Sequence, residues 1–224
     1  EKEHKAQNQR DAEARQQLAE TLRTVTGALT STLNLTEVIE RLLESLAEII
    51  AYDSSAVMLV QGNEIQVIAG RGNLVAKTTR QRSIPLGENA LYAEILHTRQ
   101  PIVLTDAQQD SRFIHYEDIG NIRGWIGVPL IYKDEVIGLL SVDSLSPGTY
   151  GQPEADITFT FAGQAAIAIE NARLFGEVQR LATTDSLTGL HTRRHFFYLA
   201  EQEFKRSLRY GTAPSAIMLD IDHF

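Results

Sequence analysis

Two carboxylates near the end of the sequence, Asp220 and Asp222, have the spacing of a candidate metal site. They flank Ile221 and follow the apolar run 216–219, which predicts a strand. Because alternate residues of a strand share a face, both side chains would lie together at the carboxyl end of that strand. Carboxylate oxygens are preferred ligands of divalent cations, but a solvated strand end has the same pattern. From the residues alone, both interpretations stay open.

The chain contains no cysteine. Its residues therefore offer no disulfide, thiolate zinc site, iron–sulfur cluster, cysteine nucleophile or thioether-linked chromophore, and a reducing, cytoplasmic setting is expected. The six histidines are scattered without the spacing of metal ligands: His4, His97, His115, His191, His195 and His223. No nucleophile–base arrangement or complete phosphate loop is visible, so an independent enzyme active within these residues is not expected.

Charge and composition narrow the range of partners. The chain of 224 residues has 21 Lys and Arg against 29 Asp and Glu, a net charge of −8, which argues against a nucleic-acid-binding surface. No apolar run approaches the roughly 18 residues that would span a membrane. The length corresponds to about one and a half domains, and a start without Met suggests an internal fragment. Small molecules and other proteins are the expected partners.

Helical periodicity marks the two ends of the chain. Residues 1–17 predict a solvated helix, and a seam with coiled-coil spacing follows at Leu18, Leu22, Val25 and Leu29. An amphipathic helix lying on its own domain is the alternative for that seam. A long helix is predicted over 154–182, and its seam consists of Ile167, Asn171, Leu174, Val178 and Leu181. A buried Asn171 in such a seam could fix register and oligomeric state.

The middle of the chain predicts a sheet with helices. A possible capping box at Asn34 and Glu37 predicts a helix from Leu35, whose apolar face would run to Ile50 and pack on the sheet. Hairpins are predicted at 56–69, with a turn at Gly62-Asn63, and at 125–142, with a turn at Lys133-Asp134. Between them the pattern gives strands at 83–86 and 102–104, a helix from Gly87 with Ala90, Leu91, Ile95 and Leu96 inward, and a loop over 106–123 with one helical turn.

The region 34–173 resembles a GAF domain, a small-molecule-binding sensor module. The resemblance rests on W-I-G-V-P-L-I-Y-K-D-E-V-I-G-L-L-S-V-D at 125–143 and on Q-A-A-I-A-I-E-N-A-R-L at 164–174. It implies an α+β fold, in which the first and last helices pack on one face of an antiparallel sheet of five or six strands. A ligand pocket is implied under helices and loops on the other face.

For that implied pocket, apolar walls and a few polar groups that orient a ligand are required. The candidates are Tyr92, Arg112, Phe113, Tyr116, Asp118, Trp125 and Ser141. Packing or surface exposure is the alternative for each, and Trp125 is as plausible a core anchor as a ligand wall. Bilin attachment and methionine sulfoxide reduction, known among GAF domains, need the cysteine that is missing. The cyclic-nucleotide signature is also incomplete, because Glu117-Asp118 reverses its acidic pair and no Asn-Lys precedes it.

The last 40 residues look like the beginning of a GGDEF domain, a diguanylate cyclase that condenses two GTP molecules into cyclic di-GMP. The resemblance rests on D-S-L-T-G-L-H-T-R-R at 185–194 and L-D-I-D-H-F at 219–224, with Thr192 where the family usually has Asn. It implies that Asp220 and the Ile221 carbonyl bind Mg²⁺ and that the backbone at His223 and Phe224 lies near the triphosphate.

The cyclase itself is expected only in an intact parent protein. The Gly-Gly-Asp/Glu-Glu-Phe hairpin is absent from this sequence, so the fragment is expected to be inactive and to require no cofactor, whereas the parent would use Mg²⁺ and GTP. An ion pair of Asp185 with Arg193 or Arg194 could close the turn before the catalytic part.

The expected organisation is a signalling helix (1–33), a GAF domain (34–173), a linker helix (174–184) and a truncated GGDEF start (185–224). The leading hypothesis is the sensory module of a bacterial-type diguanylate cyclase, a homodimer that transmits a small-molecule signal through its coiled-coil helices. The alternative is a GAF domain that binds no ligand and serves only for dimerisation and spacing.

Overall fold

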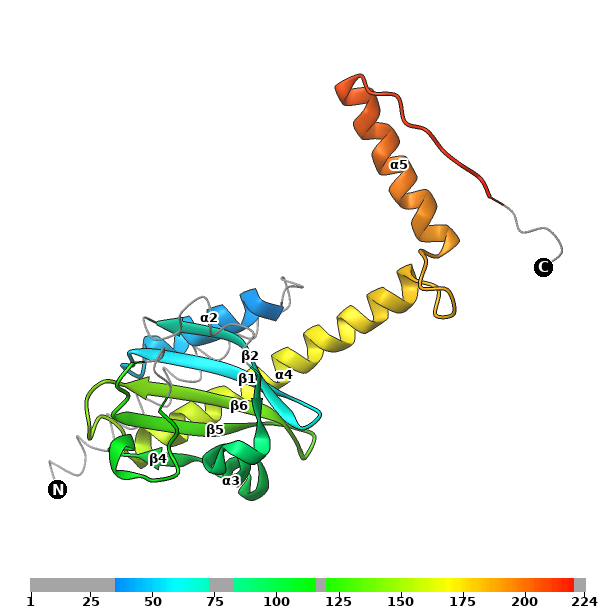
Figure 1. Ribbon diagram of the computed structural model, residues 1–224. Coiled ribbons are helices and arrows are strands. Elements are labelled where there is room, and N and C mark those ends of the chain that lie inside the picture. The colour runs from blue at the N-terminus through cyan, green and yellow to red at the C-terminus, as the bar shows by residue number, and fades with distance from the viewer. Residues whose placement is uncertain (1–34, 73–82, 116–119, 220–224) are drawn as a thin grey trace, which may run out of the picture. The chain divides into compact units, whose positions relative to one another are not determined.

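The computed structural model describes residues 35–72, 83–115 and 120–219 (Figure 1). Six antiparallel strands form one sheet in the order β3-β2-β1-β6-β5-β4. The strands are β1 (Ser54–Gln61), β2 (Glu64–Gly72), β3 (Ser83–Pro85), β4 (Ile102–Leu104), β5 (Gly124–Tyr132) and β6 (Glu135–Ser144). The expected α+β fold is confirmed, with the larger of the two expected strand numbers.

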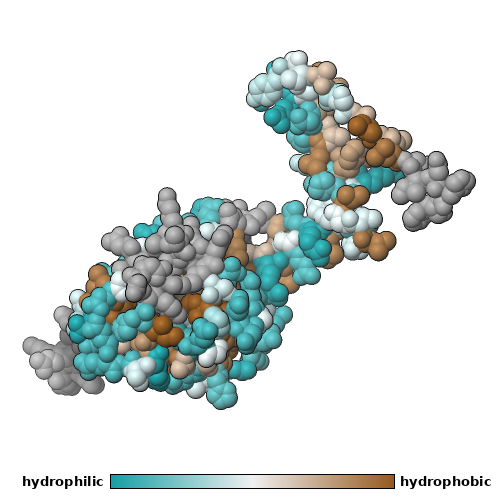
Figure 2. Space-filling model, viewed as in Figure 1, coloured by the Kyte–Doolittle hydropathy of each residue, from teal (hydrophilic) through white to brown (hydrophobic). Residues whose placement is uncertain are grey.

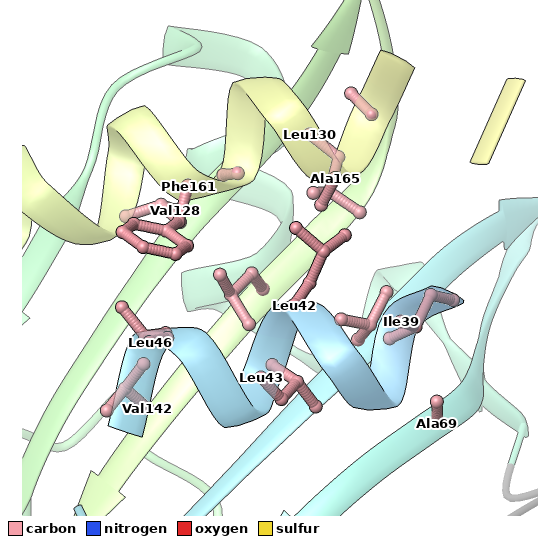
Figure 3. Close-up of a cluster of buried hydrophobic side chains, with 14 of the residues drawn as sticks. Ile39, Leu42, Leu43, Leu46, Ala69, Val128, Leu130, Val142, Phe161 and Ala165 are labelled. Carbon is pink, nitrogen blue, oxygen red and sulfur yellow. The ribbon is translucent and has the colours of Figure 1, made fainter. Parts of the chain in front are cut away.

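Two helices cover one face of the sheet, α2 (Leu35–Ala47) and the first part of α4 (Gln152–Thr183). The buried side chains of α2 recur at helical spacing: Val38, Ile39, Leu42, Leu43 and Leu46. Figure 3 shows Leu42 in one cluster with Phe161 and Ala165 of α4 and with Val128 and Leu130 of β5. Burying one such large apolar side chain contributes about 1.5–3 kcal/mol, so this face anchors the domain.

The end of α2 differs from the expectation. The helix stops at Ala47, and Ile49, which the pattern placed on the buried face, is 37% exposed. Ile50 is buried, as expected. The helical spacing no longer applies beyond Ala47, so the two isoleucines take their orientation from the turn that leads into β1.

The opposite face carries α3 (Ala90–Thr98), with the 3₁₀ turns η1 (Leu86–Glu88) and η2 (Ala107–Gln109). Asn89 caps α3, because its side-chain Oδ1 accepts a hydrogen bond from the Tyr92 amide at 3.1 Å. The helix therefore begins three residues later than Gly87. Leu91 and Ile95 point inward as expected, but Ala90 is exposed and Asn89 is buried in its place.

The β5–β6 hairpin contains a shift of register that its turn does not predict. Residues 133 and 134 have positive φ, 45° and 67°, as a type I′ turn requires. Ile131 pairs with Val136, whereas Leu130 pairs with Gly138. From Leu130 back to Gly124, each β5 residue therefore lies opposite a β6 residue one position later in the sequence than the turn alone would give.

Residues 174–224 belong to a second compact unit, and α4 runs into it. Its helix α5 spans Arg193–Tyr210, and Thr192 caps it by accepting a hydrogen bond from the His195 amide. Brown, hydrophobic surface marks this unit in Figure 2. The exposed large side chains of α5 include Phe196, Phe197, Tyr198, Phe204 and Leu208.

Two expectations for this unit were wrong. Residues 216–219 are not a strand, and Ile217, Met218 and Leu219 are 86–96% exposed. A strand needs a neighbour to pair its backbone groups, and no described segment supplies one here. The Asp185 carboxylate accepts hydrogen bonds from the amides of Leu187 and Thr188 instead of pairing with an arginine.

No helix within the described ranges is long and apolar enough to cross a membrane.

Candidate ligand site

The sheet face that carries α3 is built from rows of residues that lie opposite one another on neighbouring strands. In one row, Asp143 of β6 lies between Ser54 of β1 and Trp125 of β5. The next row holds small side chains: Ala56, Ser141 and Gly127. Directly opposite Cβ atoms are about 4.5–5.5 Å apart in such rows. This part of the sheet face therefore carries a row of small side chains next to a carboxyl group and a large aromatic ring.

Three aromatic side chains gather on the sheet face beside this row of small residues. Trp125 is 2% exposed; its ring centroid lies 6.4 Å from that of Tyr92, which stacks on it, and 5.9 Å from that of Phe113, which meets it edge-on. His115 continues the group, 5.2 Å from Phe113. The apolar side chains buried with Trp125 are Leu91, Ile95, Leu104, Ala107 and Ile122. Rings at these separations attract one another beyond the effect of burial alone.

Arg112 holds the loop that carries Phe113. Its guanidinium donates to the Asp110 carboxylate at 2.9 and 2.6 Å and to Glu94 of α3 at 2.5 Å. Hydrogen bonds from Arg112 lower the pKa of Asp110 to about 2, and Asp110 in turn raises the pKa of Arg112. Arg112 thus connects the loop to α3, and its charge is neutralised by its own neighbours.

A second arginine braces the same loop from the other end. Arg123 donates through Nε and Nη2 to the two carboxylate oxygens of Asp106, at 2.8 and 2.7 Å. The hydrogen bonds from Arg123 lower the pKa of Asp106 to about 2, with help from the Gln108 amide. Because a bidentate pair fixes orientation as well as distance, the two ends of the loop over 106–123 are held together.

Asp143 is a buried carboxyl group with a single hydrogen-bond partner among the described residues. It is 5% exposed, and its Oδ2 accepts a hydrogen bond from Ser54 Oγ at 2.7 Å. Burial raises the pKa of Asp143 from 3.8 to about 7, and the hydrogen bond from Ser54 only partly opposes that rise. Burial and the nearby Asp143 and Asp53 also raise the pKa of Tyr150. The surroundings of Asp143 are therefore acidic.

The structure brings together several residues that the sequence proposed for a ligand site. Tyr92 and Phe113 each lie against Trp125, and Ser141 lies in the small-residue row beside them. Arg112 is at the edge and is turned toward Glu94 and Asp110. Tyr116 and Asp118 lie outside the described residues.

Sequence reasoning missed Asp143 and Ser54. The alternation of Ser141 and Asp143 along an otherwise apolar strand indicated that both share a face. Nothing in that alternation indicated that Asp143 would be buried with no cationic partner in the described part of the chain. Its neighbours depend on which residues of β1 and β5 lie opposite it, and that depends on the bulge.

The other proposed sites are only partly described. Asp220, Ile221, His223 and Phe224 lie outside the described residues, as do Leu18, Leu22, Val25 and Leu29. Within the described ranges, no group of three or more His, Cys, Asp or Glu side chains could hold a metal ion. The seam residues of α4 are exposed: Ile167, Asn171, Leu174, Val178 and Leu181.

The family model for the GAF domain matches residues 32–170. Among curated proteins, the hybrid signal transduction histidine kinase G of Dictyostelium discoideum is 29% identical over 91 residues, which is 39% of this chain. The match spans 3% of that protein's length.

Solved structures agree with the family match. The GAF domain of a phosphoenolpyruvate-protein phosphotransferase from Coxiella burnetii superposes with a TM-score of 0.64 at 22% identity, covering 72% of this chain and 98% of that one. Free methionine-R-sulfoxide reductase from Neisseria meningitidis, solved in complex with its substrate, gives 0.59 at 18% identity, covering 70% and 91%. At these identities the likeness is one of fold.

Proposed function

This chain belongs to the GAF domain family, and from that membership we propose that it is a sensory module that binds a small molecule on the α3 face of its sheet. The observation that carries the proposal is the juxtaposition of the Trp125 ring cluster with the buried carboxyl of Asp143. Apolar walls with one oriented polar group are the usual composition of a small-molecule site. The cluster offers both within one register row of the sheet.

The module works as a homodimer. Leu174, Val178 and Leu181 of α4 are 44–63% exposed, at spacings of four and three residues. A parallel pairing of two such helices would cover this stripe. A change in the GAF domain could then be transmitted along the paired helices to the second unit. A ligand that binds two arrangements of that pair with different affinity shifts the balance between them.

The output is a diguanylate cyclase in the intact parent protein. Support comes from the D-S-L-T-G-L-H-T-R-R and L-D-I-D-H-F motifs. It also comes from α5, because further residues of a catalytic domain would bury its exposed aromatic side chains. Mg²⁺ would supply charge neutralisation of the GTP triphosphates there. Asp220 and the Ile221 carbonyl would hold it, and both lie outside the described residues.

Two measurements test the sensory role. Native mass spectrometry of the purified chain should show a retained small molecule, or a thermal-shift screen of metabolites should find one that raises the midpoint of unfolding. Trp125→Leu should abolish the stabilisation by that molecule. A chain that retains nothing and is stabilised by nothing in the screen would favour the alternative, a ligand-free dimerisation and spacing module.

The cyclase output needs a separate test. Reading the parent gene beyond the codon for Phe224 should reveal a Gly-Gly-Asp/Glu-Glu-Phe segment. The full-length protein should then convert GTP into cyclic di-GMP in the presence of Mg²⁺. A parent gene without that segment would refute the cyclase output and leave the sensory role standing.

A further inference from the structure

The buried carboxyl group of Asp143 has no cationic partner among the described residues. Burial of an ionised carboxylate is costly unless a positive group compensates it, which is why such groups are normally paired. Here the hydrogen-bond partner is the neutral hydroxyl of Ser54. Tyr150 lies near Asp143, and the other ionisable groups that raise the pKa of Tyr150 are acidic as well: Asp53, Tyr52 and Glu154.

Two arginines on this face are paired with other carboxylates. Arg112 pairs with Asp110 and Glu94, and Arg123 pairs with Asp106. Asp53 is also occupied, because its Oδ2 accepts hydrogen bonds from the Leu145 amide at 2.7 Å and from Ser144 Oγ. The protein itself therefore brings no compensating charge to Asp143 within the described residues, and the local field favours a cation.

We propose that the ligand of this site carries a protonated amino group that pairs with Asp143, and an apolar or aromatic body that replaces part of the Trp125 contacts. This inference rests on the proposed sensory function and names the chemical class of its ligand. The row geometry supports it, because Trp125 lies directly opposite Asp143 on β5 and Ser54 lies directly opposite it on β1. Aromatic faces next to an acidic group also attract cations.

Access to Asp143 requires a side chain to move. Trp125 lies directly opposite Asp143 and is 2% exposed, so a ligand body that replaces part of its contacts must displace the indole. Trp125 is also the only tryptophan of the chain. Its fluorescence therefore reports this step without any label.

The experiment compares three probes of similar size and different charge: phenethylamine, 2-phenylethanol and 3-phenylpropionate. Each is titrated into the full chain while Trp125 fluorescence is recorded. The amine should bind about 10- to 100-fold more tightly than the alcohol, as expected for one hydrogen bond to a charged group, and the carboxylate should bind most weakly. Affinity for the amine should rise with pH up to about 7 and then level off, as Asp143 ionises.

The variant Asp143→Asn is nearly isosteric and should remove both the preference for the amine and its pH dependence. Asp156→Asn, on the exposed side of α4, removes the same charge elsewhere and should change neither. If Asp143→Asn fails to fold, the pH profile of the unmodified chain and the weaker binding expected of Ser54→Ala still decide the matter.

Several outcomes would overturn the inference. Equal affinity for the three probes, preference for the carboxylate, or no fluorescence response to the amine would each do so. A response to potassium or sodium chloride alone would assign the position to a metal cation instead. None of these results would remove the sensory role, because a retained or stabilising ligand of another class would still support it.

Discussion

The indole ring of Trp125 lies across the backbone of Gly127, two residues further along β5. A methyl group at residue 127 would lie 2.2 Å from Cη2 of Trp125 and 2.6 Å from Cδ1 of Ile95. Glycine at this position is therefore what lets the largest side chain of the cluster lie flat on the sheet. The position of the ring over the candidate site depends on the absence of one carbon atom.

Gly127→Ala should displace the Trp125 ring and destabilise the domain by about 1–3 kcal/mol, because an added methyl group overpacks the cluster. Chemical denaturation would measure the loss, and the fluorescence maximum of Trp125 should shift to the red as the ring becomes wetter. Gly163→Ala in α4 is the control: a Cβ there meets nothing within 4 Å, so it should stabilise by about 0.5–1 kcal/mol. Unchanged stability and fluorescence in Gly127→Ala would contradict the packing.

Stability should fall as pH rises from about 4 to about 7, through the effect of Asp143. The folded state keeps a proton on this carboxyl up to a pKa of about 7, whereas the ordinary pKa of this group is 3.8. Between these two pKa values the folded state binds more protons than the unfolded state, so each rise of one pH unit lowers the free energy of unfolding by about 1.4 kcal/mol. Above pH 7 this loss is constant.

Urea denaturation across that pH range would test this prediction. The variant Asp143→Asn has no proton to lose at this position, so its stability should fall less steeply with pH than that of the unmodified chain. Parallel pH profiles for the two proteins would show that Asp143 does not titrate in this way.

Val178→Glu should dissociate the proposed homodimer, because it places two charges in the apolar stripe of α4. Val178 is 63% exposed in the chain, so the substitution should leave the fold of the domain intact. Light scattering after size-exclusion chromatography would report the mass. Gln179→Glu introduces the same charge at the next residue of α4, outside the stripe, and should remain dimeric. A monomeric unmodified chain at high micromolar concentration would argue strongly against the dimer.

The first turn of α5 should depend on the hydroxyl of Thr192. Its Oγ1 accepts a hydrogen bond from the His195 amide at 3.4 Å and donates one to the Ala182 carbonyl at 3.1 Å. Thr192→Ala should cost about 1 kcal/mol of local stability, whereas Thr192→Asn should be tolerated because asparagine caps equally well. Hydrogen exchange of the His195 amide would measure both; equal exchange in both variants would contradict the cap.

Much of the fold could be predicted from the sequence because its elements are encoded locally. The apolar spacing of Val38, Leu42 and Leu46 fixes the buried face of α2, and Lys133-Asp134 marks a hairpin turn. The predictions failed where contacts with other residues of the folded chain decide the local structure. Residues 216–219 have strand composition but no described neighbour, and α3 begins at Ala90 because a buried Asn89 side chain caps it.

The candidate site shows the same division. The sequence by itself determined the family, the strands of the six-stranded sheet, and the aromatic side chains that gather over it. A two-residue turn at 133–134 would have placed Trp125 opposite Val142. The bulge between Leu130 and Ile131 moves the pairing by one residue and puts Asp143 there instead. Because side chains of a strand alternate between faces, that single residue decides which group lies beside the ring, and only the tertiary structure could decide it.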